Sequence, residues 1–406
     1  MKIRILIAML VIAAVGAGYF FWSLKDRDLK MVPYGTDALI LIDVKEVKEQ
    51  YIFSWLKHPS QWFRKREQKI QLKRAGVEIP DFVQIFHLKD TSFAQWYCVL
   101  KVKDRSALVN FLTENGFKTI QKNVYKKDEI SVKVSDARCI FGFSNSEFDI
   151  KGEWILKSKM QTLYANNLIN NSVASLSYFG PGKIHKFGIY IQDNSLEIKT
   201  KTVNDLSSAK IEKFQNVPFL QFRLDDKNVK IAAKILNQNI PDSVKIDAVS
   251  GDSTLEEVND KVVTYSYDEN FNEVETVRYQ KLVKPNYRIS FMSADPLLLQ
   301  TYFKKIQWIN PQNQFTAIPF QPNSTEITSS QIIVTSVGKS VQPVSEPSAN
   351  YLFLRNSSLL RGLVGSFSRY AAATVEDLDY LYYGNGADYY ILKLKFKNSQ
   401  TPLILR

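Results

Sequence analysis

One pattern recurs four times in this chain: an apolar stretch of strand length ends in an acidic residue, and a segment of helical character follows. The acidic residues are Asp43, Asp104, Asp225 and Asp295. An aspartate at such a junction can accept hydrogen bonds from the free N–H groups of the first helical turn, and its charge matches the positive end of the helix dipole. Four strand–helix units in one chain predict the α+β class with mainly antiparallel sheets.

The four units fall into two similar halves. The tripeptide Ile-Pro-Asp follows the first helix of each half, at residues 79–81 and 240–242. Each half also ends in a predicted hairpin, and Asn385-Gly386 in the second half is a strong signal for a tight turn. We therefore predict two tandem, related α+β modules, residues 31–205 and residues 206–406.

The two halves differ by two insertions. The first half has an extra segment, Tyr51 to Arg74, between its first helix and its Ile-Pro-Asp. The second half has an inserted polar hairpin, around Val262–Tyr267 and Glu273–Tyr279. Because loops on a rigid scaffold carry most binding and catalytic residues, we expect function to differ between the halves at these insertions.

The N-terminal part of the chain contains a long apolar run, residues 5–24, which follows the basic residues Lys2 and Arg4. About 20 apolar residues at 1.5 Å each suffice to span a hydrocarbon core of about 30 Å. We therefore predict that residues 1–30 form a signal-anchor transmembrane helix with short flanks, so that the membrane is one partner. The expected location is a bacterial inner membrane, as a single-pass protein whose C-terminal part lies in the periplasm. A cleaved signal peptide is the alternative.

Positive charge is concentrated near the N-terminal end of a chain whose formal net charge is +12. Segment 51–74 combines aromatic residues with lysine and arginine, a composition that suits contact with anionic lipid or with an acidic envelope protein. The alternative is a helix whose aromatic residues face the core while its charges face water. Nucleic acid is not expected as a partner, because the predicted anchor places the modules outside the cytoplasm. The candidate contact residues are Lys57, Trp62, Arg64, Lys65, Arg66, Lys69, Lys73 and Arg74.

No residue pattern points to a catalytic, cofactor-binding or metal site. The two cysteines and three histidines are too few and too scattered for a zinc site of the Cys/His type. Ser54 and Lys57 have the spacing found in penicillin-recognising enzymes, but the Lys-Thr-Gly element of those enzymes is missing. Cys98 and Cys139 both lie in predicted strands, where either one disulfide or two buried thiols is possible.

Residues 32–46 combine Val-Pro, four further residues, an alanine, an apolar strand, an aspartate and the start of a helix. Together with the preceding apolar run, this opening resembles uncharacterised membrane-anchored bacterial envelope proteins. The resemblance implies an envelope location and transfers no site residues. We expect a non-enzymatic binding or scaffolding protein that faces the periplasm. A hydrolase acting on an envelope polymer and a membrane-surface sensor that uses residues 51–74 are the alternatives.

Overall fold

The structure, a computed structural model, describes most of the chain and divides into two compact units. The units are Met1–Asp193 with Gln400–Arg406, and Asn194–Ser399. We predict the module boundary between residues 205 and 206, whereas the units meet at 193/194, so that strand β13 (Ser195–Lys199) belongs to the second unit. The described residues are 24–61, 74–92, 94–170, 172–200, 214, 217–235, 240–241, 243–318, 323–336, 350–360, 376–386, 389–397, 399 and 401–405.

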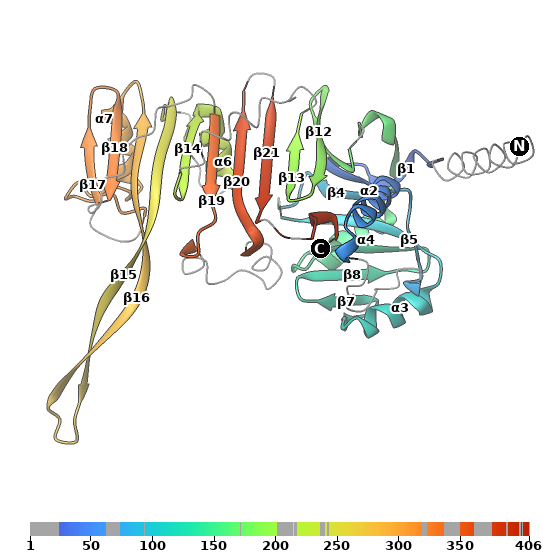
Figure 1. The fold of residues 1–406 in the computed structure, drawn as a ribbon, viewed down its shortest axis with the longest axis horizontal. Helices are drawn as coiled ribbons and strands as arrows, with labels where there is room; N and C mark the ends of the chain where they lie inside the picture. The colour runs from blue at the N-terminus through green and yellow to red at the C-terminus, as the bar shows by residue number, and fades with distance from the viewer. Residues whose placement is uncertain are drawn as a thin grey trace, which may run out of the picture. The chain divides into compact units, whose positions relative to one another are not determined.

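The first unit is built around an antiparallel sheet with the strand order β12, β11, β2, β4, β5, β9, β8, β7, β6 (Figure 1). Its strands are β2 (Thr36–Asp43), β4 (Phe82–Leu88), β5 (Trp96–Val102), β6 (Lys118–Gln121), β7 (Val124–Lys127), β8 (Ile130–Val134), β9 (Arg138–Phe143), β11 (Ala174–Gly180) and β12 (Lys183–Gln192). Strand β3 (Val77–Glu78) also pairs with β5, and β1 (Asp28–Pro33) pairs with β10 (Met160–Tyr164) in a separate sheet. Within the described part of this unit β6 pairs with β7 alone, so it forms an edge of the sheet.

Helices in the first unit accompany two separate hydrophobic clusters. Helix α4 (Phe148–Lys157) packs in the cluster that contains Ile140, and α3 (Arg105–Glu114) contributes Leu108 to the cluster that contains Cys139. Side chains alternate between the two faces of a strand, which is why the neighbours Cys139 and Ile140 lie in different clusters. The other helical elements of the unit are α2 (Val44–Lys57) and the 3-10 helices η1 (Pro59–Gln61), η3 (Ala165–Asn167) and η4 (Leu403–Leu405).

The second unit has an antiparallel sheet with the strand order β17, β18, β16, β15, β14, β19, β20, β21, β13. Helix α7 (Pro296–Lys305) buries Leu299 and Phe303 against Phe291 of the sheet, and α6 (Asp226–Ile235) contributes Val229 to the same hydrophobic cluster. The strands are β14 (Leu220–Asp225), β15 (Ala248–Tyr267), β16 (Glu273–Met292), β17 (Asn323–Ile327), β18 (Gln331–Ser336), β19 (Asn350–Arg355), β20 (Leu378–Asn385) and β21 (Tyr390–Phe396).

The two units share one strand arrangement. In each, the first central strand (β2 or β14) lies between the strand that follows its helix (β4 or β15) and a strand from late in the unit (β11 or β19). The next strand (β5 or β16) precedes the second helix and pairs with β9 or β18. The order β12-β11-β2-β4-β5-β9-β8 therefore matches the order β20-β19-β14-β15-β16-β18-β17.

The four predicted strand–acid–helix junctions are confirmed. Asp43 accepts hydrogen bonds from the backbone N–H groups of the first turn of α2, at 3.0 and 3.1 Å. The carboxylates of Asp104, Asp225 and Asp295 each accept the N–H of the residue three positions later, at 2.9 to 3.0 Å. Each junction satisfies N–H groups that a helix start otherwise leaves without a partner.

The predicted α+β fold class is wrong, because the protein consists mainly of antiparallel β-sheet. The described residues include five α-helices, of 10 to 14 residues each, beside sheets that run through both units. The sequence pattern marks where each helix starts, and it overestimates how much of the fold the helices contribute.

The predicted transmembrane helix and signal anchor are also corrected. Residues 5–23 of the apolar run lie outside the described residues, and among those described there is no helix long and apolar enough to cross a membrane. The longest described α-helix, α2, has 14 residues; at 1.5 Å each it measures about 21 Å, short of a hydrocarbon core of about 30 Å. The structure therefore gives no support for the predicted location, a single-pass protein of the inner membrane with a periplasmic part.

Candidate functional site

The predicted basic contact segment is only partly described. Lys57 is the exposed last residue of α2, and Arg74 is exposed at the far end of the segment. The structure does not bring these two residues together into a site. The other candidates, Trp62, Arg64, Lys65, Arg66, Lys69 and Lys73, lie outside the described residues.

The cysteines and histidines of the chain all lie in the first unit. Cys98 and Cys139 are free thiols on the paired strands β5 and β9, and burial raises the pKa of each to about 12. A thiol with that pKa stays protonated near neutral pH and is a poor nucleophile. His87 is buried between the carboxylate of Asp37, at 2.6 Å, and the backbone oxygen of Ser92, at 3.0 Å. Cys98, Cys139 and His87 are therefore parts of the sheet, while the third histidine of the unit after His58 and His87, His185, is exposed on β12.

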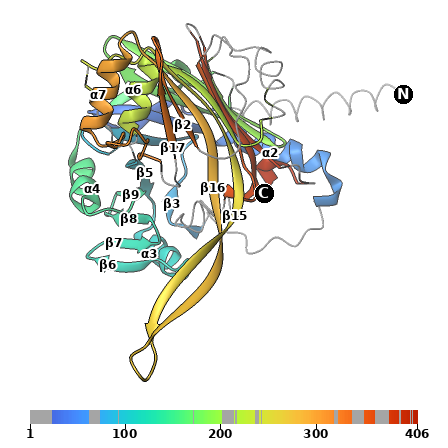
Figure 2. The same cartoon turned by 90° about the vertical axis from the view of Figure 1, so that its left-hand side faces the viewer.

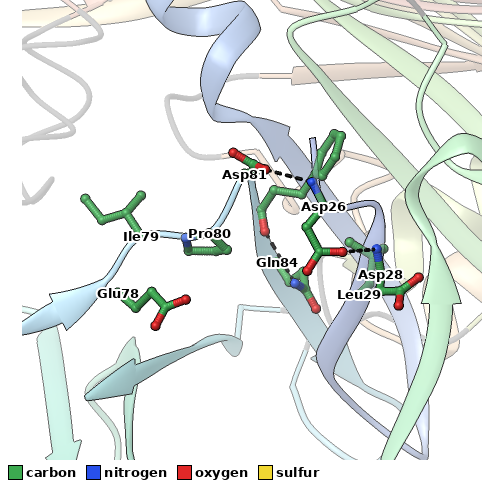
Figure 3. Close-up of a pocket in the computed structure, with 9 residues that line it drawn as sticks. Asp26, Asp28, Leu29, Glu78, Ile79, Pro80, Asp81 and Gln84 are labelled. Carbon is green, nitrogen blue, oxygen red and sulfur yellow. Dashed lines mark hydrogen bonds between the residues drawn. The ribbon is translucent and has the colours of Figure 1, made fainter. Parts of the chain in front are cut away.

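A cavity of about 250 Å³ in the first unit is lined by the carboxyl groups of Asp26, Asp28, Glu78 and Asp81 (Figure 3). Each carboxyl group has a partner. Asp81 accepts the backbone N–H of Asp26 at 2.8 Å and pairs with Lys45 at 3.2 Å, while Asp26 accepts the backbone N–H of Asp28 at 3.1 Å.

The remaining two carboxylates of the cavity pair with lysines. Asp28 lies 3.4 Å from Lys30, and Glu78 lies 3.3 Å from Lys101. In the described part of the chain there is no group of three acidic, histidine or cysteine side chains placed to hold a metal ion. The carboxylates of the cavity are therefore used in local contacts, of which the Asp81 hydrogen bond with the N–H of Asp26 ties the residues before β1 to the start of β4.

The most unusual feature of the structure is a long two-stranded ribbon. Strands β15 and β16 have 20 residues each and pair with one another along their whole length. Strand β14 pairs with residues 248–253, and β18 pairs with residues 288–292. Residues 254–287 thus continue beyond the sheet, and Figures 1 and 2 show the ribbon running well past the neighbouring strands of its unit. We call residues 254–287 the arm; at about 3.3 Å per residue it is about 45 Å long.

Polar cross-strand pairs stabilise the half of the arm nearest the sheet. Lys281 pairs with Glu257 at 2.8 Å, and the side-chain amide of Asn286 donates to Glu256 at 2.8 Å. The hydrogen bond with Glu257 raises the pKa of Lys281 above its ordinary value. Such cross-strand pairs contribute about 0.2–1 kcal/mol each, so this part of the arm is held in register without a third strand.

The outer half of the arm carries exposed aromatic side chains on one face. In the register, Tyr265 lies opposite Glu275, Tyr267 opposite Glu273, and Lys261 opposite Tyr279. Directly opposite residues share a face, and alternate residues along a strand return to it, so the three tyrosines lie on the same face. Their exposed fractions are 63, 70 and 72%. We call Tyr265, Tyr267 and Tyr279, with Val263 and Val277 between them, the aromatic face.

The tip of the arm is an ordered turn that presents a phenylalanine. One carboxylate oxygen of Asp268 accepts the backbone N–H groups of Asn270 and Asn272, both at 2.8 Å. These contacts, led by the one with Asn272, hold the pKa of Asp268 below its ordinary value. Phe271 has a φ of +61° and is 86% exposed. A bulky residue is strained at positive φ, and strain of this kind is concentrated at functional positions.

The sequence predicts this hairpin but not its extent. Alternation around Val262–Tyr267 and Glu273–Tyr279 marks the outer part, while Pro285 argues against one continuous strand. Proline is tolerated there because β18 no longer pairs with β16 at that point. The signal for the aromatic face is the alternation of tyrosine with polar residues from Val263 to Tyr267, which places aromatic side chains on one side.

Comparison of this chain with protein-family models, with curated proteins and with solved structures finds no match. The resemblance to uncharacterised envelope proteins therefore stays a prediction from residues 32–46. The arm is the feature on which a function can be argued.

Proposed function

We propose that this protein is a non-enzymatic binding protein and that the arm is its binding element. The observation that carries the proposal is the aromatic face: three tyrosines and the tip phenylalanine are exposed on the arm, which pairs with no third strand among the described residues. Large aromatic side chains that are exposed to water contribute the most binding free energy when a partner buries them. Tyrosine is also among the residue types that dominate binding energy at protein interfaces.

The shape of the arm favours binding over catalysis. Enzymes and small-molecule sites use concave pockets that surround a ligand. A two-stranded ribbon presents two open faces, which suits insertion into a groove or contact with a second protein. The scaffold is suited to this role as well, because β15 and β16 continue into the central strands of the sheet of the second unit and hold the base of the arm.

Site-specific photo-cross-linking in the cells that make the protein tests the proposal. Benzoylphenylalanine replaces Tyr265 or Tyr267 in one pair of variants, and Thr264 or Ser266 in the matched pair on the opposite face. The proposal predicts adducts at a defined mass from the first pair and little or none from the second. Equal labelling from both faces, or no adduct from either, would refute the arm as the binding element.

A further inference from the structure

The outer arm and one edge of the first unit have opposite charges. Residues 265–275 of the arm contain four acidic residues and no basic one. Residues 118–127, which form the β6–β7 hairpin, contain four lysines and no acidic residue. The excess of charge is thus −4 on one element and +4 on the other, in a chain whose overall net charge is +12.

The lysines of the β6–β7 hairpin are available for a partner. Lys118, Lys122 and Lys126 are exposed, and none of them forms an ion pair with a described residue. Lys118 and Lys126 also lie directly opposite one another on the paired strands. Like charges in that position are unfavourable, and an acidic partner would relieve the repulsion. Ile120, 51% exposed on β6, adds an apolar contact beside them.

The acidic residues of the arm are equally available. Glu273 and Glu275 lie opposite Tyr267 and Tyr265, so they belong to the same face as the tyrosines. Glu269 lies in the turn at the tip. None of the three glutamates pairs with a cation in the described part of the chain. The outer arm therefore presents tyrosine and carboxylate side by side, which matches the lysine and isoleucine side chains of the hairpin.

We infer that the outer arm of one molecule binds the β6–β7 hairpin of a second copy of this chain. The inference rests on the proposed function, since it uses the same arm, and it names the partner. Among the described strands, β6 pairs with β7 alone, so its outer edge is one that a second ribbon can join. Lysine on an exposed edge also hinders uncontrolled pairing, so that an acidic ribbon is the one that fits. An anionic lipid surface is disfavoured, because it would repel the acidic tip.

This contact joins two different surfaces, so it is heterologous. Two copies can form a closed dimer in which each arm binds the other's hairpin, and further copies can form a ring or a chain. Because the contact is largely electrostatic, added salt weakens it.

Charge reversal with the purified full-length chain tests the inference. One variant carries E269K, E273K and E275K in the arm; another carries K118E, K122E and K126E in the hairpin. Sedimentation velocity over a range of concentrations is expected to show association of the unaltered chain at low salt, weakened about tenfold or more at 0.5 M salt. Each variant alone is expected to be monomeric, and an equimolar mixture of the two is expected to associate. A control with K89E, K103E and K151E has the same change in net charge as the hairpin variant and should associate like the unaltered chain.

Three results would overturn the inference: a monomeric unaltered chain at low salt, association that survives both charge reversals, or variants that do not complement each other in the mixture. Failure here is distinguishable from failure of the proposed function. Cross-linking of Tyr267 to a protein other than this chain would leave the arm as a binding element and exclude the second copy as its partner. Circular dichroism spectra identical to that of the unaltered chain confirm that each variant is folded.

Discussion

Removal of the outer arm should leave the stability of the protein almost unchanged. The deletion joins Asp260 to Gln280, which lie directly opposite one another, through Asn-Gly in place of residues 261–279. Asn-Gly favours the tight turn that connects paired strands. Every pairing of β15 with β14 and of β16 with β18 is retained, because those contacts involve only residues 248–253 and 288–292.

The expected change in the free energy of unfolding is less than about 1 kcal/mol, since an isolated two-stranded ribbon is only marginally stable in water. The deleted tyrosines are already largely hydrated, with 63 to 72% of their surface exposed. The little apolar area that they bury is offset by the entropy gained when the deleted residues are no longer ordered.

Urea titration followed by circular dichroism measures this free energy for the deletion variant and for the unaltered chain. Coincident transitions, together with loss of self-association, would show that the arm serves binding and not folding. A loss of 3 kcal/mol or more (about the cost of a large core truncation) would refute the reasoning, because it would mean that the outer arm packs against the rest of the fold.

Three further changes test the packing and electrostatics. Phe303→Ala should lower the free energy of unfolding by about 3–5 kcal/mol in the same titration. Phe303 is 1% exposed, and its ring centroid lies 5.1 Å from that of Phe291 and 5.3 Å from that of Trp308. A loss below about 1 kcal/mol would contradict this core packing. Asp43→Ala should cost about 2 kcal/mol, since it removes the cap of α2 and the ion pair with Lys25, while Asp43→Asn should lose less; equal losses would contradict the capping role.

The pKa of Glu153 is lowered from 4.5 to about 2, first by its contact with Lys133 and then by its contact with Lys157. Lys133→Met should therefore raise this pKa. Because the folded pKa is depressed, the stabilisation is present above pH 4.5 and is lost as the pH falls toward 2. A carboxyl-carbon NMR titration measures the pKa, and an unchanged pKa would contradict the assigned cause.

How far the sequence predicts this protein depends on whether the governing interactions are local. The helix starts are predictable because a cap such as Asp104 needs only a hydrogen bond to the N–H three residues later. The proportion of helix to sheet is not predictable in this way, because it depends on which distant strands pair with one another, as β2 does with β11. The candidate site is predicted in part: the hairpin insertion is visible, but the register that gathers Tyr265, Tyr267 and Tyr279 on one face emerges only from the pairing.

The charge complementarity shows the same limit. A count of lysines predicts a basic surface, and segment 51–74 has the denser cluster. The hairpin at 118–127 becomes a candidate partner only because β6 lies at a sheet edge and Lys118 faces Lys126 across it. Neither fact is contained in composition or spacing.

Hydroxyl-radical footprinting of the side chains tests most directly whether the aromatic face is a binding surface. The purified chain, diluted at high salt, should be oxidised readily at Tyr265, Tyr267 and Phe271, in keeping with their exposure. In intact cells that make the protein, we expect these three side chains to be protected, whereas Tyr178, 48% exposed in the first unit, should be oxidised as in the purified chain. Equal oxidation of the arm in both preparations would contradict the account, because it would show that nothing covers the aromatic face where the protein works.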